Sequence, residues 1–162
     1  MTIKKFIKEA EQAALSAPPG DLVTQLRLVM ADNFVFYFKA HSFHWNVVGP
    51  NFPQYHEFFS GVYTAAFAAV DRIAEEIRAL DEYAPKSLNE LIGISSLNEN
   101  KADLDATAMV RALADDNQKI LGGLLATQKM AEAANQVGLA NYLQDLYDSH
   151  KKLAWMLSSI LK

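Results

Sequence analysis

The sequence predicts an all-α protein built on a four-helix bundle, and three features of the chain carry that prediction. Apolar residues recur at spacings of three and four over long stretches, as expected for amphipathic helices. Only 7 glycines and 5 prolines occur in 162 residues, and they are concentrated at a few places, which leaves room for long helices. No segment shows the strict alternation of a β-strand.

The first part of the chain predicts a short helix followed by a long one. Residues 3–15 form an amphipathic pattern that ends before the Ala17-Pro18-Pro19-Gly20 break. Asp21 is then a suitable N-cap for the next helix, because its carboxylate can accept from the first free backbone N–H groups. This helix is expected to continue through His44 towards Gly49-Pro50.

The second long helix has the strongest periodic signal in the chain. Asn51 is its expected N-cap, and Pro53 is tolerated in a first turn. The helix is expected to stop near Tyr83-Ala84-Pro85. Its apolar stripe consists of Phe59, Val62, Tyr63, Ala66, Val70, Ile73, Ala74, Ile77 and Leu80.

A short helix is expected in the middle of the chain. Ser87 and Glu90 are spaced as in a capping box, which predicts a helix over residues 88–92. Gly93 is the expected end of this helix.

Two further long helices complete the pattern. The first of them runs from about residue 105 to 136, and Gly122 and Gly123 inside it indicate close packing against a neighbour. Gly138 is the expected turn residue before the last helix. The stripe of that last helix comprises Leu139, Leu143, Leu146, His150, Leu153, Leu157 and Ile160.

The connection over about residues 83–104 is long enough to run the length of a bundle. One long crossover between two antiparallel helix pairs is the ferritin-like topology. We expect one domain over residues 1–162, with residues 1–20 as an N-terminal helix or extension.

Composition excludes several kinds of chemistry. There is no cysteine, so disulfides and thiolate metal sites are ruled out, and a metal site must use His, Asp or Glu. No phosphate-binding loop, nucleophile elbow or dinucleotide fingerprint occurs. Glu-x-x-His is also missing, which excludes the in-chain di-iron centre built on two such motifs. Without a long apolar run or a signal peptide, a cytoplasmic protein is expected.

The candidate metal ligands are His44, His56, Asp71 and Glu75, a set that suits a divalent transition metal such as iron. His44 closes one helix and His56 opens the next, so the two imidazoles can lie together. Asp71 follows His56 by fifteen residues, which is about 60° of rotation but about 22 Å along a helix. Metal–ligand bonds are only about 2.0–2.2 Å long. One chain therefore cannot close the site, whereas two antiparallel copies of the helix in a two-fold dimer can.

Simpler interpretations exist for the individual residues. Taken alone, Asp71 and Glu75 are consistent with solvated surface charges, and His56 with a surface or capping histidine. His41 can line the same end as His44, and His150 is expected as a hydrogen-bonded core histidine. Aromatic residues near the site are expected to pack in the core or an interface rather than to act in redox chemistry; they are Phe34, Phe36, Phe38, Phe43 and Trp45.

Taken together, three segments resemble the Dps family, the DNA-binding proteins from starved cells or mini-ferritins. They are His44-Trp45-Asn46-Val47-Val48-Gly49-Pro50-Asn51-Phe52, His56-Glu57 and Asp71-Arg72-Ile73-Ala74-Glu75, with Leu153-Ala154-Trp155-Met156-Leu157 as a looser match. The resemblance implies a hollow dodecamer of two-fold dimers, with ferroxidase sites at the dimer interface and a ferric mineral inside. It implies His44 and His56 as ligands from one subunit, Asp71 and Glu75 from the other, and Trp45 beside the site.

Three positions depart from the family pattern. Ser60 stands where the family has an acidic residue, which removes one charge and leaves a hydroxyl that can act only through water. Glu76 replaces an arginine after the matched Glu75. Asn141 replaces an acid associated with the pore through which iron enters, and the nearby Asp145 and Asp148 are candidate substitutes.

The sequence thus predicts a mini-ferritin that oxidises Fe(II), with hydrogen peroxide as the usual oxidant, and stores ferric iron against oxidative damage. Two alternatives remain at this point. One is a DNA-compacting, nucleoid-associated protein that uses Lys4, Lys5 and Lys8, although a net charge of −4 and the adjacent Glu9 and Glu11 favour a solvated helix face. The other is a shell protein whose site has decayed, with Ser60 as the motivating feature.

Overall fold

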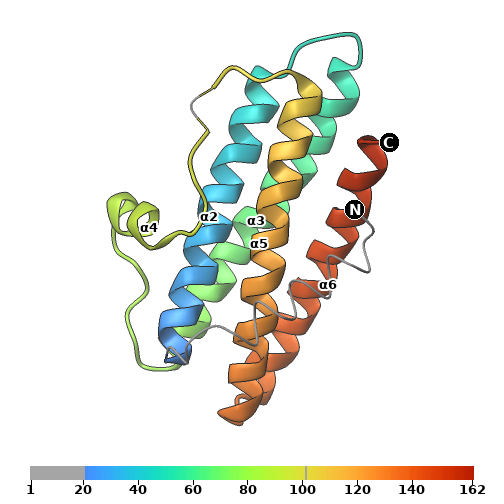
Figure 1. The fold of residues 1–162 in the computed structure, drawn as a ribbon. Helices are drawn as coiled ribbons and strands as arrows, with labels where there is room; N and C mark the ends of the chain where they lie inside the picture. Colours follow the sequence, from blue (N-terminus) through green and yellow to red (C-terminus); the bar gives the residue numbers. More distant parts are fainter. Residues whose placement is uncertain (1–20, 101) are drawn as a thin grey trace.

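The computed structural model describes residues 21–100 and 102–162, in which five helices follow one another (Figure 1). They are α2 (Leu22–Asn46), α3 (Phe52–Ala79), α4 (Leu88–Ile94), α5 (Ala106–Ala133) and α6 (Val137–Ile160). The helix expected over residues 3–15 lies outside the described residues. None of the helices in the described ranges is both long and apolar enough to cross a membrane.

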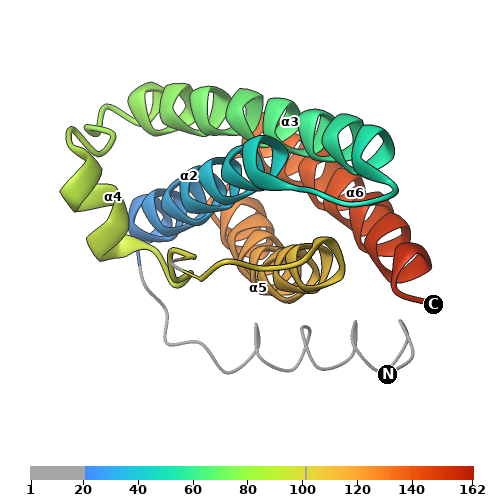
Figure 2. The ribbon, with the colours of Figure 1, turned by 90° about the horizontal axis from the view of Figure 1, so that it is seen from above.

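The four long helices form a bundle, which confirms the predicted architecture. α2 packs most extensively against α3, and α5 against α6, while α2 also contacts α5 (Figures 1 and 2). α4 lies in the crossover and packs on α2, beside the bundle rather than within it. The topology is therefore the ferritin-like one, with a long crossover between two helix pairs.

Side-chain caps start two of the helices as the sequence predicts. The Asp21 carboxylate accepts from the Val23 backbone N–H at 3.1 Å and begins α2. Ser87 Oγ accepts from the Glu90 N–H at 3.2 Å and begins α4. Each cap satisfies a backbone donor that has no partner within the helix.

Asn51 is the N-cap of α3 as predicted, although its side chain makes no capping hydrogen bond. Other predicted boundaries were wrong because different residues make the turns. Gly93 lies inside α4, and Gly138 lies inside the first turn of α6. The turn before α6 is made by Asn135 with φ of +56°, and α3 ends before Asp81 with φ of +61°. Asn and Asp tolerate this left-handed backbone better than most residues, and Asn135 takes the turn position expected of Gly138.

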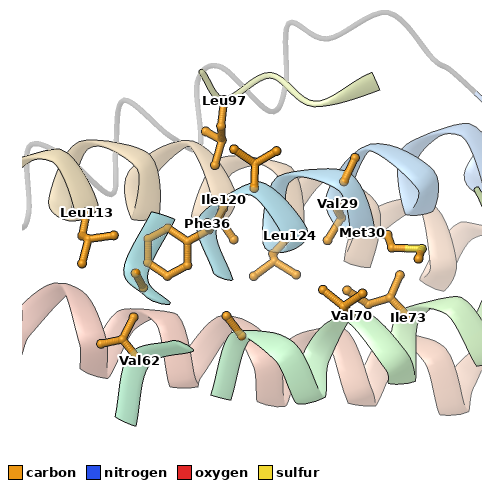
Figure 3. Packing of buried hydrophobic residues seen from close by; sticks show 14 of the residues in the cluster. Val29, Met30, Phe36, Val62, Val70, Ile73, Leu97, Leu113, Ile120 and Leu124 are labelled. Carbon is orange, nitrogen blue, oxygen red and sulfur yellow. The ribbon is translucent and has the colours of Figure 1, made fainter. Parts of the chain in front are cut away.

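The core runs the length of the bundle and is filled by apolar side chains from all four long helices. Phe36 of α2 lies fully buried at its middle, near Val62 of α3 and Leu113 of α5 (Figure 3). A Cβ at Gly123 would meet the Val29 side chain at 3.5 Å, an ordinary van der Waals contact, so the close packing predicted for this glycine does not require it. Gly122 has no such neighbour within 4 Å.

The buried charged side chains Lys39, Asp116 and Asp32 all form ion pairs or hydrogen bonds within the described residues. Lys39 of α2 forms an ion pair with Asp116 of α5. Asp32 accepts from the Ser95 hydroxyl at 2.7 Å and from the Ser96 N–H and hydroxyl at 2.7 and 2.8 Å, which fastens the crossover to α2. Burial raises the pKa of Asp32, although these hydrogen bonds oppose the effect.

His150 is the hydrogen-bonded core histidine that the sequence predicts. Its Nδ1 lies 2.6 Å from Asn117 Oδ1, and Asn117 Nδ2 donates to the His150 carbonyl at 3.0 Å. Burial lowers the pKa of His150 to about 4, because the cationic ring would lose its hydration in the core.

Acid should destabilise the fold through His150. Its pKa falls from 6.5 to about 4 on folding, so the neutral ring stabilises the protein above pH 6.5 and that stabilisation is lost as the pH falls towards 4. The loss should be about 3 kcal/mol, since one pKa unit corresponds to about 1.4 kcal/mol. Urea unfolding at a series of pH values should show this slope in the wild type and a flatter one in His150→Gln. Equal slopes would contradict the assignment.

Candidate metal centre

The turn between α2 and α3 brings two of the predicted ligands together. α2 ends as the Val47 N–H donates to the Phe43 carbonyl at 2.9 Å, and the Phe52 N–H then donates to the Gly49 carbonyl at 3.1 Å. Gly49 has φ of +123°, an angle that a residue with a Cβ rarely adopts. This tight reversal places the last turn of α2 beside the first turns of α3.

His44 and His56 hold each other in place across this turn. His44 Nδ1 lies 2.7 Å from the His56 carbonyl oxygen, and His56 Nδ1 lies 2.8 Å from the His44 carbonyl oxygen. The rings stack with their centroids 3.6 Å apart and their planes at 22°. Both side chains are half-buried.

This reciprocal bonding decides the chemistry of the two rings. A carbonyl oxygen only accepts, so each Nδ1 carries its proton. In the neutral form each Nε2 then carries the lone pair, and neither Nε2 has a hydrogen-bond partner within the described ranges. A histidine that donates from one nitrogen to a carbonyl and keeps the other free is the usual arrangement of a metal-ligating imidazole.

Other aromatic rings surround this pair. His41 stacks on Tyr63 at 3.9 Å between centroids and contacts Trp45 at 4.1 Å, and Tyr63 lies edge-on to His44 at 5.2 Å. Burial, and then the neighbouring His44, lower the pKa of His41. Sequence reasoning placed Tyr63 only in the core stripe, although its position seven residues after His56 puts it on the same helix face.

Asp71 and Glu75 do not join the histidines within the chain. α3 is continuous from Phe52 to Ala79, so the helical separation of about 22 Å between His56 and Asp71 holds. Among residues 21–100 and 102–162, no group of three His, Asp or Glu side chains is placed to hold a metal ion. The structure therefore brings together two of the four predicted ligands and leaves both carboxylates exposed.

The neighbours of the two carboxylates leave them free. Arg72 pairs with Glu76 at 2.6 Å, and its guanidinium lies 5.3 Å from the Tyr142 ring centroid. Glu76, which departs from the family pattern, thus forms an ion pair with Arg72. Because the two charges cancel, Glu76 adds no net negative charge beside Asp71. Ser60, one turn after His56, is half-buried.

The predicted pore residues are exposed on α6, where Asp148 lies 3.8 Å from Lys151 and accepts weakly from Gln144 at 3.4 Å. Their role in a pore remains a prediction.

A broad apolar surface adjoins the candidate ligands. Phe38, Trp45 and Phe67 are 49%, 56% and 55% exposed. A cavity of about 410 Å³ lies between this surface and α4, lined among others by Phe38, Phe67, Leu88 and Ile92. Phe67 precedes Asp71 by one helical turn, so the apolar surface and the carboxylate share a face of α3.

The chain is similar in sequence to known ferritin-like proteins, in agreement with its four-helix bundle. Residues 23–162 match the family model of the ferritin-like domain. The chain is 32% identical to DNA protection during starvation protein 2 of Bacillus anthracis over 86% of its length and 96% of that protein. It is 31% identical to the corresponding Brevibacillus brevis protein over 82% of its length and 89% of that protein.

Solved structures show the same fold. Dps from Staphylococcus aureus superposes with a TM-score of 0.85 at 32% identity, covering 88% of this chain and 95% of that one. Dps from Vibrio cholerae, described as a member of a broad superfamily of ferritin-like diiron-carboxylate proteins, superposes with a TM-score of 0.84 at 26% identity, covering 87% and 89%. The bundle and its crossover define a ferritin-like protein. Within that class, the chain belongs to the Dps family.

Gly49→Ala should destabilise the turn that pairs the histidines. A Cβ at φ of +123° costs about 1–3 kcal/mol of backbone strain, which should appear as a lower free energy of unfolding in urea. Gly61→Ala is the matched control, because Gly61 lies within α3 with open space where a Cβ would stand. That control should gain up to about 1 kcal/mol from helix propensity. A loss of similar size in both variants would refute the role given to Gly49.

Proposed function

We propose that the protein binds and oxidises Fe(II) at sites shared between two subunits and stores the ferric product. The observation that carries this proposal is the pair of Nδ1-anchored imidazoles of His44 and His56, whose Nε2 atoms have no partner in the described structure. Asp71 and Glu75 of a second copy would complete the ligand set. Imidazole nitrogen and carboxylate oxygen suit ferrous iron, and the anionic oxygens favour the ferric product.

A two-fold dimer supplies the missing half of the site. If two copies of α3 lie antiparallel, His56 of one copy faces Asp71 of the other, and two equivalent sites form. The exposed rings of Phe38, Trp45 and Phe67 support this face as the contact, since isolated subunits rarely expose apolar surface of this kind. Assembly of such dimers into a dodecamer is the arrangement that family membership favours.

The reaction is a metal-centred redox step. Two Fe(II) ions each give up one electron, and one molecule of hydrogen peroxide accepts both electrons and two protons to become two waters. The protein contributes ligands that stabilise the higher charge and an apolar contact that excludes bulk water. Trp45, 4.1 Å from His41, borders the site and is placed to shield it.

Ser60 sets the number of ions that each site holds tightly. It lies one turn after His56, on the same face of α3, where a carboxylate would bridge to a second ion. A neutral hydroxyl offers no charge and is a weaker ligand for a divalent ion. We therefore propose one tightly held iron per site, with a second bound weakly or through water.

The DNA-compacting alternative rests on Lys4, Lys5 and Lys8, which lie outside the described residues. The names of the Bacillus and Brevibacillus relatives refer to DNA protection. With a net charge of −4, this chain offers little electrostatic support for binding DNA, so iron oxidation is the function that we propose.

Mixed assemblies should test the shared site directly. His44→Ala and Asp71→Ala should each abolish rapid peroxide-dependent oxidation of Fe(II), because each removes a ligand from every site. In a heterodimer of the two variants, one of the two sites again has all its ligands. Co-assembly from an equal mixture, followed by the absorbance of ferric iron, should therefore recover about one quarter of the wild-type sites.

Two comparisons make this recovery decisive. Each variant refolded alone and then mixed without dissociation should stay inactive, which controls for residual activity. A site built within one chain would give no recovery in the mixed assemblies, and such a result would contradict the shared site.

Ser60→Asp should add a second tightly bound ion. Anaerobic titration with Fe(II) should saturate near one ion per site in the wild type and near two in Ser60→Asp, because the new carboxylate supplies charge and a bridging oxygen. Ser60→Ala is the matched control and should behave as the wild type. Two tight ions in the wild type would refute the role given to Ser60.

A further inference from the structure

A second cavity lies between α3 and α6, on the other side of the bundle from the cavity beside α4. Its volume is about 320 Å³, and its walls are formed largely by apolar side chains that include Phe36, Phe58, Leu146 and Met156. Close backbone contacts join α2 to α3 and α5 to α6, whereas α3 and α6 make few with each other. Space for a small ligand therefore remains between these two helices.

The cavity contains one buried polar group whose hydrogen-bonding state is fixed. His150 lines it. Asn117 donates its Nδ2 to the His150 carbonyl, so its Oδ1 faces the ring and accepts from Nδ1–H. Burial keeps this ring neutral near pH 7. The Nε2 lone pair is therefore an acceptor, and it has no partner in the described part of the chain.

The rim of the same cavity carries a positive charge. Lys152 and Ser149 line it, and both residues are exposed. The neighbouring Lys151 pairs with Asp148, whereas Lys152 forms no ion pair within the described ranges. The cavity is thus an apolar space lined by a buried histidine with a free acceptor and by an exposed cation. It suits a small molecule that combines an apolar body with a hydrogen-bond donor and a negative charge.

We propose that this cavity binds a small phenolic carboxylate. The aromatic ring fills the apolar space, the phenol O–H donates to His150 Nε2, and the carboxylate pairs with Lys152. A single benzene ring needs about 150 Å³, so one ring with its two substituents fits the available volume. Binding involves no covalent or redox step.

This site is separate from the proposed iron site. Ala65, which lines the cavity, follows His56 by nine residues, which is about 180° around α3. A dimer formed through the His56 and Asp71 face therefore leaves the cavity open. Binding can be measured on metal-free protein, so its outcome does not depend on iron oxidation.

Calorimetric titration of the full-length, metal-free protein with 4-hydroxybenzoate tests the proposal. Saturable binding with a dissociation constant on the order of 1 mM or tighter is expected for a ligand of this size. 4-Methoxybenzoate lacks the donor and should bind about three- to tenfold more weakly, which is the usual contribution of one neutral hydrogen bond. Equal affinity for the two compounds would overturn the role of His150.

A filled cavity provides the structural test. Gly61→Leu extends a side chain from the wall of the cavity, at a position where nothing lies within 4 Å of an added Cβ. It should fold as the wild type and lose binding. Gly122→Leu is the matched control, since Gly122 is also helical with open space but lies outside the cavity. The control should bind normally.

A crystal soaked with 3-iodo-4-hydroxybenzoate locates the ligand by the anomalous signal of iodine. Iodine between α3 and α6, with the phenol oxygen at His150, supports the proposal. No saturable binding by the wild type, binding that survives Gly61→Leu, or iodine only at another site would each overturn it.

Discussion

The reciprocal bonding of His44 and His56 is the constraint on which the rest of the site depends. Each ring donates to the backbone carbonyl of the other, so neither ring can rotate without breaking a bond to the opposite helix. The same two contacts fasten the end of α2 to the start of α3, and the positive φ of Gly49 allows the short turn between them. The two hydrogen bonds that join the helix ends thus also decide that Nε2, rather than Nδ1, is the free nitrogen of each imidazole. The same backbone carbonyl therefore has two effects on each histidine. It holds the ring against the opposite helix, and it selects the tautomer with the proton on Nδ1.

The rigidity of α3 then explains why one chain carries only half of the proposed metal centre. An unbroken helix of 28 residues keeps His56, near its start, and the two carboxylates, near its end, on related faces. The separation along the axis cannot be shortened by a side-chain rotation, since each residue adds about 1.5 Å. Asp71 and Glu75 therefore stay exposed, beside the apolar ring of Phe67. Exposed aromatic surface is unfavourable in an isolated subunit, because water must order around it, whereas the carboxylates are well hydrated there. In the proposed interface, burial of the aromatic surface would drive association and a bound cation would compensate the carboxylates.

Much of this arrangement could be predicted from the sequence, because it follows from helical periodicity. The four long helices, the short helix in the crossover, the pairing of His44 with His56 and the burial of His150 all come from spacing. The turn residues were harder to predict, since Asn135 adopts the left-handed backbone expected of Gly138. The stacking of His41 on Tyr63 could not be predicted either, because it depends on side-chain directions across two helices. Nor does residue spacing reveal that His44 and His56 donate from Nδ1 to the backbone, because this depends on the orientation of each ring.

The buried polar groups explain why we place the proposed metal chemistry at the surface of this bundle rather than in its centre. Within the described residues, Asp32 is occupied by the serines of the crossover, and Asp116 by Lys39. The buried imidazole of His150 is as well anchored through Nδ1 as those of His44 and His56, but no group of His, Asp and Glu suited to a metal ion surrounds it. A neutral nitrogen alone does not compensate a divalent cation for its lost hydration in an apolar space. The same free Nε2 therefore suits different proposed uses, a metal ligand where a partner's carboxylates can approach and an acceptor for a neutral donor where they cannot.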